Sequence, residues 1–177
     1  MIMAVKFDCF ESLLTELKEI FLLNGLTLST AESCTGGLIG AVVTSLPGSS
    51  MFYDGSVVVY SNLQKIKLLN IDKALLDEYG AVSEECSLEM AKNLKKITGS
   101  SVTVSTTGIA GPAGGTRLKP VGRVYSSVCF QESINTFRFD FSGTRNEIRI
   151  KTVEAVLQKL ILLLKSCNYH ILFEERF

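Results

Sequence analysis

The sequence predicts a three-layer α/β/α sandwich around a mixed β-sheet, and three observations lead to that prediction. Helix-like and strand-like segments alternate through the first part of the chain, which favours parallel strand pairing. Two strand-like segments then follow one another directly, at Arg123–Phe130 and Thr136–Phe141, which favours an antiparallel pair. No internal repeat, low-complexity stretch or linker divides the 177 residues, so we expect one domain over residues 1–177.

The N-terminal part reads as helix, strand, helix and strand. Apolar residues at helical spacing predict a helix over Phe7–Leu23, which Asn24-Gly25 ends. Leu26–Ala31 follows as a short strand. A second helix comes after Gly36-Gly37 and ends before Pro47. The β-branched run Gly55–Tyr60 predicts a buried strand.

The middle of the chain predicts three helices and a strand. The first two helices cover Asn62–Leu69 and Lys73–Tyr79. Ser83 is the expected N-cap of the third, because Glu84 and Glu85 follow it in the first turn. This helix ends at Gly99 and is expected to bury four side chains, those of Cys86, Met90, Leu94 and Ile97. The strand Val102–Thr106 comes next.

The C-terminal part begins with a loop, Gly108–Val121, that holds four glycines and two prolines. After the two adjacent strands, a long helix is predicted over Asn146–Cys167. Its expected buried stripe consists of Val153, Val156, Leu157, Leu160, Ile161 and Leu164. The tail from Asn168 to Phe177 is assigned to no element.

Composition and charge narrow the function classes. The hydrophobic fraction is 46%, and 18 basic residues balance 18 acidic ones, so the chain has no general attraction for nucleic acid or an anionic membrane. No run is long and apolar enough for a membrane span, and Lys6 and Asp8 interrupt the place of a signal-peptide core. The five cysteines are scattered and form no CxxC pair, which argues against disulfides and a zinc site. We therefore expect a cytoplasmic protein with reduced thiols.

Three segments that could carry chemistry lie at the predicted carboxyl ends of strands. They are Glu32–Gly37, Tyr60–Lys65 and Thr107–Gly115. Because ligands of open α/β sheets bind beyond the carboxyl ends of the strands, we expect these segments to converge on one site.

Ser33 lies at a strand-to-helix turn followed by small residues, and two interpretations are open. In one, the hydroxyl is a nucleophile and the backbone N–H groups of the turn hold an oxyanion or another anion. In the other, Ser33 or Thr35 only caps the following helix.

A nucleophilic serine needs a base, and the chain offers two types. Its one histidine, His170, lies in the tail, far in sequence from the glycine-rich loop. Lys65, on the first turn of a predicted helix, would serve if burial lowered its pKa, and Tyr60 could relay or orient the proton. The alternative is that Lys65 is a solvated helix residue and Tyr60 a sheet aromatic.

The remaining candidates are the glycine-rich loop and two arginines. Residues 107–115 match neither the P-loop nor the dinucleotide-binding pattern, so they form either a ligand wall or an ordinary connection. Arg145 and Arg149 open the last helix, where basic residues oppose the macrodipole. This placement indicates either an anionic partner such as a phosphate or an ion pair with Glu147 or another carboxylate.

Seven blocks in order resemble the CinA C-terminal domain family, over about Leu26 to Leu164. They are Thr30-Ala31-Glu32-Ser33-Cys34-Thr35-Gly36-Gly37, Pro47-Gly48-Ser49-Ser50, Tyr60-Ser61-Asn62, Lys65, Gly80-Ala81-Val82-Ser83, Thr107-Gly108-Ile109-Ala110-Gly111-Pro112 and Lys119-Pro120-Val121-Gly122. The family includes stand-alone amidohydrolases that convert nicotinamide mononucleotide (NMN) and water to nicotinate mononucleotide and ammonia, in pyridine nucleotide recycling. The resemblance implies the CinA C-terminal fold and this activity.

The resemblance also implies the roles of individual residues. It makes Ser33 the nucleophile, Lys65 the general base and Tyr60 a supporting residue. It implies no metal or cofactor, NMN as the ligand, and a homo-oligomer, a dimer or higher. The neutral net charge adds the expectation of no nucleic acid or membrane partner. The implied substrate-binding residues are Glu32, Thr35, Gly36, Thr107, Gly108, Ala110, Gly111 and Arg145.

The chain departs from the family pattern in small ways. Leu63-Gln64 stands where Glu-Ala is frequent, and Thr144 stands where Asp often precedes the late arginine. The N-terminal molybdopterin-binding-like domain of larger members has no counterpart in residues 1–177, which favours the stand-alone enzyme. A non-catalytic nucleotide-binding protein and a competence- or damage-related regulatory protein are the alternative functions.

Overall fold

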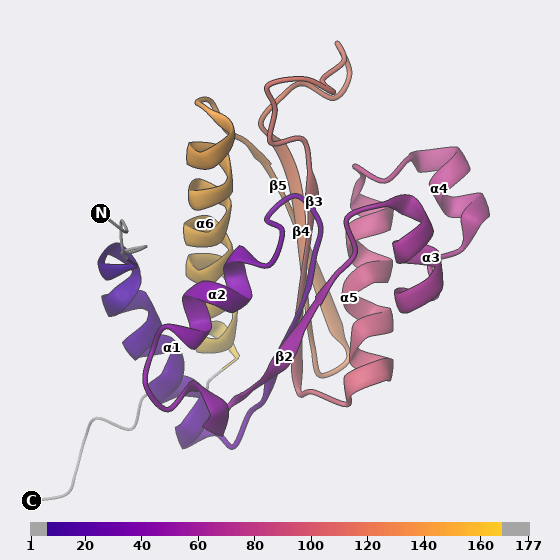
Figure 1. Ribbon diagram of the computed structural model, residues 1–177. Coiled ribbons are helices and arrows are strands. Elements are labelled where there is room, and N and C mark those ends of the chain that lie inside the picture. The colour runs from indigo at the N-terminus through magenta and orange to yellow at the C-terminus, as the bar shows by residue number, and fades with distance from the viewer. Residues whose placement is uncertain (1–6, 168–177) are drawn as a thin grey trace, which may run out of the picture.

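The computed structural model describes residues 7–167 and contains a five-stranded mixed sheet. The sheet lies between two layers of helices (Figure 1). The strands are β1 (Leu28–Glu32), β2 (Tyr53–Val58), β3 (Val102–Gly108), β4 (Arg123–Phe130) and β5 (Ser133–Asp140). β1 pairs in parallel with β2 and β3, whereas β3–β4 and β4–β5 are antiparallel. The predicted three-layer α/β/α sandwich is therefore confirmed. In spatial order the strands are β2, β1, β3, β4 and β5.

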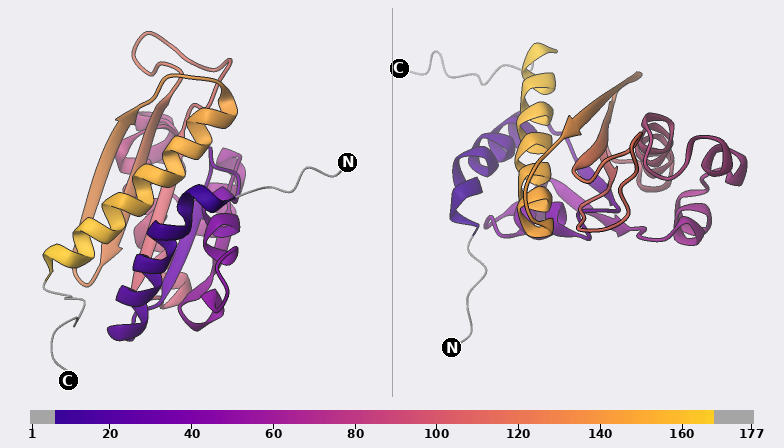
Figure 2. Two further views of the ribbon diagram at one scale, coloured as in Figure 1. Left: turned by 90° about the vertical axis from the view of Figure 1, so that its left-hand side faces the viewer. Right: turned by 90° about the horizontal axis from the view of Figure 1, so that it is seen from above.

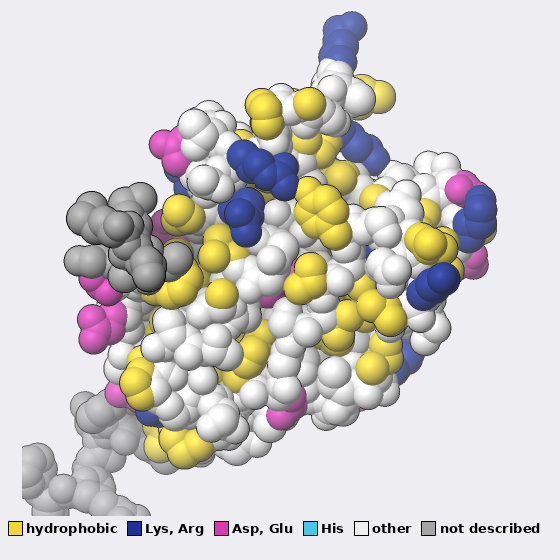
Figure 3. Space-filling view, in the orientation of Figure 1, with side chains coloured by type: hydrophobic (Ala, Val, Ile, Leu, Met, Phe, Trp, Pro, Cys, Tyr) yellow, Lys and Arg dark blue, Asp and Glu magenta, His cyan; other side chains and the backbone are white. Residues whose placement is uncertain are grey.

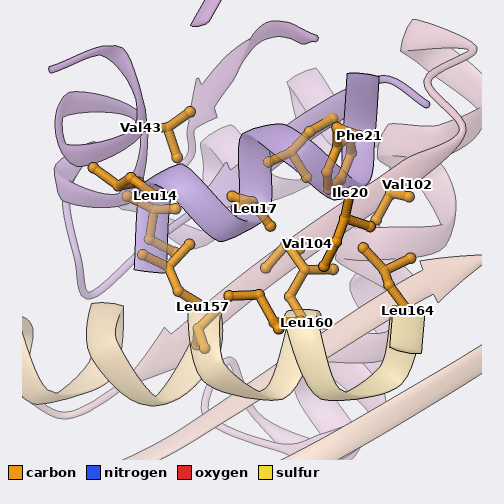
Figure 4. Close-up of a cluster of buried hydrophobic side chains, with 14 of the residues drawn as sticks. Leu14, Leu17, Ile20, Phe21, Val43, Val102, Val104, Leu157, Leu160 and Leu164 are labelled. Atoms are coloured by element: carbon orange, nitrogen blue, oxygen red, sulfur yellow. The ribbon is translucent and has the colours of Figure 1, made fainter. Parts of the chain in front are cut away.

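Three helices cover one face of the sheet: α1 (Glu11–Leu23), α2 (Leu38–Thr44) and α6 (Arg145–Ser166) (Figure 2). Leu17 of α1 and Leu160 of α6 meet over the sheet in the largest apolar cluster (Figure 4). Both side chains are fully buried, and burial of a leucine contributes about 1.5–3 kcal/mol. The whole predicted stripe of the last helix is buried.

The other face is covered by α3 (Asn62–Leu69), α4 (Lys73–Tyr79) and α5 (Glu84–Thr98). These helices pack Leu69, Leu76 and Met90 against Ala31 of β1. Ser83 caps α5 as predicted, because its Oγ accepts a hydrogen bond from the Cys86 N–H at 3.1 Å.

Two local predictions are wrong. β2 is not a buried strand: it lies at the edge of the sheet, where its residues alternate between half-buried and exposed. Ile97 is 49% exposed, because its side chain lies outside the face of α5 that packs against the sheet.

The strand directions bring the three candidate segments to one edge of the sheet. β1, β2 and β3 end at the same edge, and β5 leads from there into the first turn of α6 (Figure 1). The connection between β3 and β4, residues 109–122, rises above this edge. His170 lies outside the described residues. No helix within residues 7–167 is long and apolar enough to cross a membrane.

Candidate active site

A cavity of about 200 Å³ opens at this edge of the sheet. In the space-filling view, Lys and Arg side chains gather beside apolar ones on the upper part of the molecule (Figure 3). The predicted site residues that line the cavity are Ser33, Tyr60, Lys65, Thr107, Gly108, Ala110 and Arg145. The lining residues that sequence reasoning missed are Cys34, Asn62, Ala81 and Val82. Each of these four residues lies inside one of the seven sequence blocks that resemble the CinA C-terminal domain family. Membership of such a block was the signal that could have identified them.

Ser33 and Lys65 meet in this cavity. Lys65 Nζ lies 2.8 Å from Ser33 Oγ and 2.9 Å from the carbonyl oxygen of Val59. Ser61 caps α3 by accepting a hydrogen bond from the Gln64 N–H, which starts the helix where Lys65 turns inward. Lys65 is only 1% exposed, so the interpretation of a solvated surface lysine is wrong.

Burial lowers the pKa of Lys65, because an ammonium loses its hydration there. A thiolate at Cys86 or Cys34 would raise the pKa of Lys65 again. Burial also raises the pKa of Cys34 to about 12 and that of Cys86 to about 11, so both thiols stay neutral near pH 7. They therefore supply no negative charge that would hold Lys65 in its protonated form.

Cys34 is next to Ser33 but is not a candidate nucleophile. Its side chain packs with Ala110, Val124 and Ile148 in a small apolar cluster. With a pKa of about 12, the thiol gives almost no thiolate at neutral pH.

The turn after β1 is not closed by the cap that the sequence suggested. The N-cap of α2 is Gly37, and neither Ser33 nor Thr35 caps that helix. The Ser33 N–H donates to the Thr106 carbonyl at 2.9 Å, which continues the β1–β3 pairing. Gly36 N–H donates to the Ser33 carbonyl at 3.0 Å and closes the turn. The Ser33 hydroxyl is thus left for Lys65.

Glu32 performs the capping, and its predicted contact with substrate is not what the structure shows. Its carboxylate accepts hydrogen bonds from the N–H groups of Ile39 at 3.0 Å and Gly40 at 2.8 Å, and from Ser56 Oγ at 3.2 Å. The residue is fully buried and does not line the cavity. β1 runs one residue further than predicted, and strand alternation directs Glu32 toward α2. The N–H groups of α2 are therefore already taken.

Three further predicted substrate contacts do not line the cavity: Thr35, Gly36 and Gly111. Thr35 Oγ1 is 2.9 Å from Thr106 Oγ1, and both residues are fully buried. The Gly111 carbonyl accepts a hydrogen bond from Arg145 at 2.9 Å.

Tyr60 and Arg145 meet at the mouth of the cavity. Arg145 Nη2 donates to Tyr60 Oη at 2.7 Å, and Tyr60 is 60% exposed. The hydroxyl of Tyr60 therefore bonds to Arg145 rather than orienting the Lys65 proton. The alternative of an ion pair with Glu147 or another carboxylate is wrong as well. Glu147 forms a capping box with Thr144, and neither Arg145 nor Arg149 forms an ion pair within residues 7–167.

Gly108 brings backbone close to Ser33. The Thr106 carbonyl points toward β1, and Gly108, two residues later, has the same orientation in the strand. Its N–H therefore points to the side of Ser33. A Cβ at position 108 would lie 2.7 Å from the Arg123 carbonyl oxygen, so only glycine fits here. Thr107 Oγ1 donates to the Ala81 carbonyl at 2.6 Å and joins β3 to the opposite wall.

The chemistry of this cavity follows from its charged groups. Among the described residues that line it, Lys65 and Arg145 are the basic residues and no carboxylate occurs. A hydroxyl bonded to a buried amine is the arrangement of a serine nucleophile with a lysine base. No group of three or more His, Cys, Asp or Glu within residues 7–167 is placed to hold a metal ion.

Comparisons with known proteins agree with this fold. Residues 10–164 match the model of the CinA C-terminal domain. A CinA-like protein of Endomicrobium trichonymphae is 48% identical over 141 residues, which are 80% of this chain and 33% of that protein. A putative competence-damage inducible protein of Clostridium perfringens is 45% identical over 135 residues, 76% of this chain and 33% of that protein. The chain thus spans about a third of the length of these curated relatives.

Solved structures match over nearly their whole length. The competence damage-inducible protein A (ComA) of Klebsiella pneumoniae has a TM-score of 0.85 at 32% identity, with 87% of this chain and 96% of that chain covered. The competence/damage inducible protein CihA of Agrobacterium tumefaciens has a TM-score of 0.84 at 37% identity, with 87% and 94% covered.

Proposed function

The chain belongs to the CinA C-terminal domain family, and on that premise we propose that it is an amidohydrolase that converts NMN and water to nicotinate mononucleotide and ammonia. The observation that carries this proposal is the contact of 2.8 Å between Lys65 Nζ and Ser33 Oγ in the cavity. Burial of Lys65 supports it, because only a neutral amine accepts the serine proton.

The first half of the reaction forms an acyl-enzyme. Neutral Lys65 takes the proton of Ser33 Oγ while the oxygen attacks the carboxamide carbon of the nicotinamide. The Gly108 N–H is directed to the Ser33 side, where it can donate to the developing oxyanion. Lys65 then gives its proton to the leaving nitrogen, and ammonia departs.

The second half repeats the transfer with water. Neutral Lys65 takes a proton from water, the hydroxide attacks the ester carbon, and Ser33 Oγ leaves with the proton from Lys65. The product is nicotinate mononucleotide. Arg145 lies at the mouth of the cavity, where its guanidinium suits the phosphate of a mononucleotide whose amide reaches Ser33.

The direct test is to incubate the purified protein with NMN and measure both ammonia and nicotinate mononucleotide. We expect equal amounts of the two products from the wild type, and a loss of at least about 10³-fold in Ser33→Ala. Ser133→Ala is the matched control, since Ser133 is exposed at the opposite end of the sheet, and it should keep the full rate. Near-wild-type ammonia release by Ser33→Ala would contradict the proposal.

The alternative functions predict different results in the same preparation. A nucleotide-binding module without catalysis would bind NMN with no product formed in either protein. Direct action on DNA would require binding to a duplex at low salt, whereas a net charge of zero predicts a flat binding curve.

A further inference from the structure

Arg149 reaches from α6 to the turn that carries Ser33. Its Nε and Nη2 both donate to the Thr35 carbonyl oxygen, at 3.1 Å and 2.8 Å. The contact joins residues 114 positions apart in the sequence. Arg149 does not line the cavity, so it touches the turn from behind.

The turn contains two glycines, and its own backbone holds the Thr35 carbonyl through the Leu38 N–H at 3.3 Å. Gly36 and Gly37 have φ values of +61° and +88°, in the left-handed region that glycine adopts readily. The peptide unit between Thr35 and Gly36 can therefore rotate with little steric resistance. Two donors fixed on one carbonyl oxygen oppose that rotation.

The fixed peptide unit also orients the next one. With its carbonyl held by Arg149, the Thr35–Gly36 unit directs the Gly36 N–H to the Ser33 carbonyl at 3.0 Å. The Ser33 carbonyl belongs to the same peptide unit as the Cys34 N–H, so that unit is held too. Hydrogen bonds aligned in this way polarise one another, which strengthens the Cys34 N–H as a donor.

We infer that Arg149 is a positioning residue, which fixes the backbone of the Ser33 turn so that hydroxyl and N–H groups keep the geometry needed for attack. This inference rests on the proposed role of Ser33 as nucleophile. Glu32 holds the other side of the same turn through α2. The turn is therefore clamped by an arginine on its carbonyl and by a carboxylate on the helix that follows.

The test measures the nucleophile with and without NMN. A fluorophosphonate reagent reports on Ser33 directly: a bond forms between Ser33 Oγ and phosphorus, the P–F bond breaks, fluoride leaves, and the serine proton passes to Lys65. For Arg149→Met we expect the labelling rate and kcat for NMN to fall by about 10- to 100-fold, with KM within about two-fold. Arg149→Lys, which keeps the charge and one donor group, should lose less.

Lys151→Met is the control on the same helix. Lys151 also donates to a carbonyl, that of Ser142 at 2.8 Å, but on the exposed surface away from the cavity. We expect unchanged labelling and kcat. Equal labelling rates in the wild type, Arg149→Met and Arg149→Lys, each shown to be folded by its melting curve, would overturn the inference. Labelling that depends on Arg149 in a protein without NMN turnover would support it and contradict only the proposed substrate.

Discussion

Two walls of the cavity differ in how firmly they are held. The turn from Ser33 to Gly37 is buried at Ser33, Cys34 and Thr35 and is bound from β3, α2 and α6. The loop over residues 109–122 is exposed along 112–118 and is attached through a few side chains. Lys119 donates to the Tyr79 carbonyl at 2.6 Å, and Arg145 donates to Gly111.

This difference in burial suits the two walls to different tasks, catalysis at the turn and ligand selection at the loop. Bond making and breaking needs groups that keep their distances, and the buried turn supplies them. An exposed loop tolerates changes in sequence and shape, so it can alter which ligand is admitted without disturbing the nucleophile. Changes at the turn should therefore act on kcat or stability, and changes at the loop side on KM.

The largest effect is expected at Lys65, which serves the buried side. Lys65→Met removes the base, so kcat for NMN should fall by at least about 10³-fold, while KM changes little. A kcat within about two-fold of the wild type would contradict the role of Lys65 as the base that activates Ser33.

Lys65→Met should also reveal the burial of the amine through stability. Because burial lowers the pKa of Lys65 in the folded state, the unfolded chain binds more protons between the folded and unfolded pKa values. Wild-type stability should therefore rise with pH through that window relative to the variant. Parallel melting temperatures of the two proteins at every pH would contradict this.

Arg145→Met tests the open side next. Loss of the guanidinium should raise KM for NMN by about 10- to 100-fold, the effect of one charge-assisted contact, with a smaller change in kcat. The same variant should discriminate less between NMN and the uncharged nicotinamide riboside. An equal fall in kcat for both compounds would contradict a role in phosphate binding and would indicate that Arg145 acts on the reaction at Ser33.

Glu32→Gln tests the support behind the turn. The amide keeps one acceptor oxygen and turns its NH₂ toward the N–H groups of Ile39 and Gly40, so we expect a loss of about 1–3 kcal/mol in the free energy of unfolding. Glu11→Gln, in the exposed first turn of α1, should lose less than about 1 kcal/mol. Denaturant titrations of both variants make the comparison, and equal losses would contradict the anchoring role.

The smallest effect is expected in the loop. Lys119→Met removes one contact to Tyr79 and should raise KM only a few-fold, with stability changed by less than about 1 kcal/mol. Leu118→Ser, at a side chain 81% exposed, should change neither. A large fall in kcat in Lys119→Met would mean that the loop is as firmly coupled to catalysis as the turn.

Features that depend on a short stretch of sequence were predicted correctly. The alternation of elements and the spacing of apolar residues predicted the strands and helices. The family resemblance paired Ser33 with Lys65, and the two side chains are in contact in the structure. Glu32 was assigned wrongly because one extra strand residue decides which face a side chain takes. The edge position of β2 depends on strand order, which no segment encodes alone. The contact of Arg149 with Thr35 needs the folded chain.

In the proposed reaction, a neutral, buried Lys65 activates Ser33 for hydrolysis of NMN. The most direct measurement is the rate of ammonia release from NMN by the wild type as a function of pH. We predict that kcat/KM rises with unit slope as Lys65 loses its proton and levels off below the ordinary lysine range, because burial lowers the pKa of this amine. A pH-independent rate, or one that still rises through the ordinary lysine range, would contradict the claim.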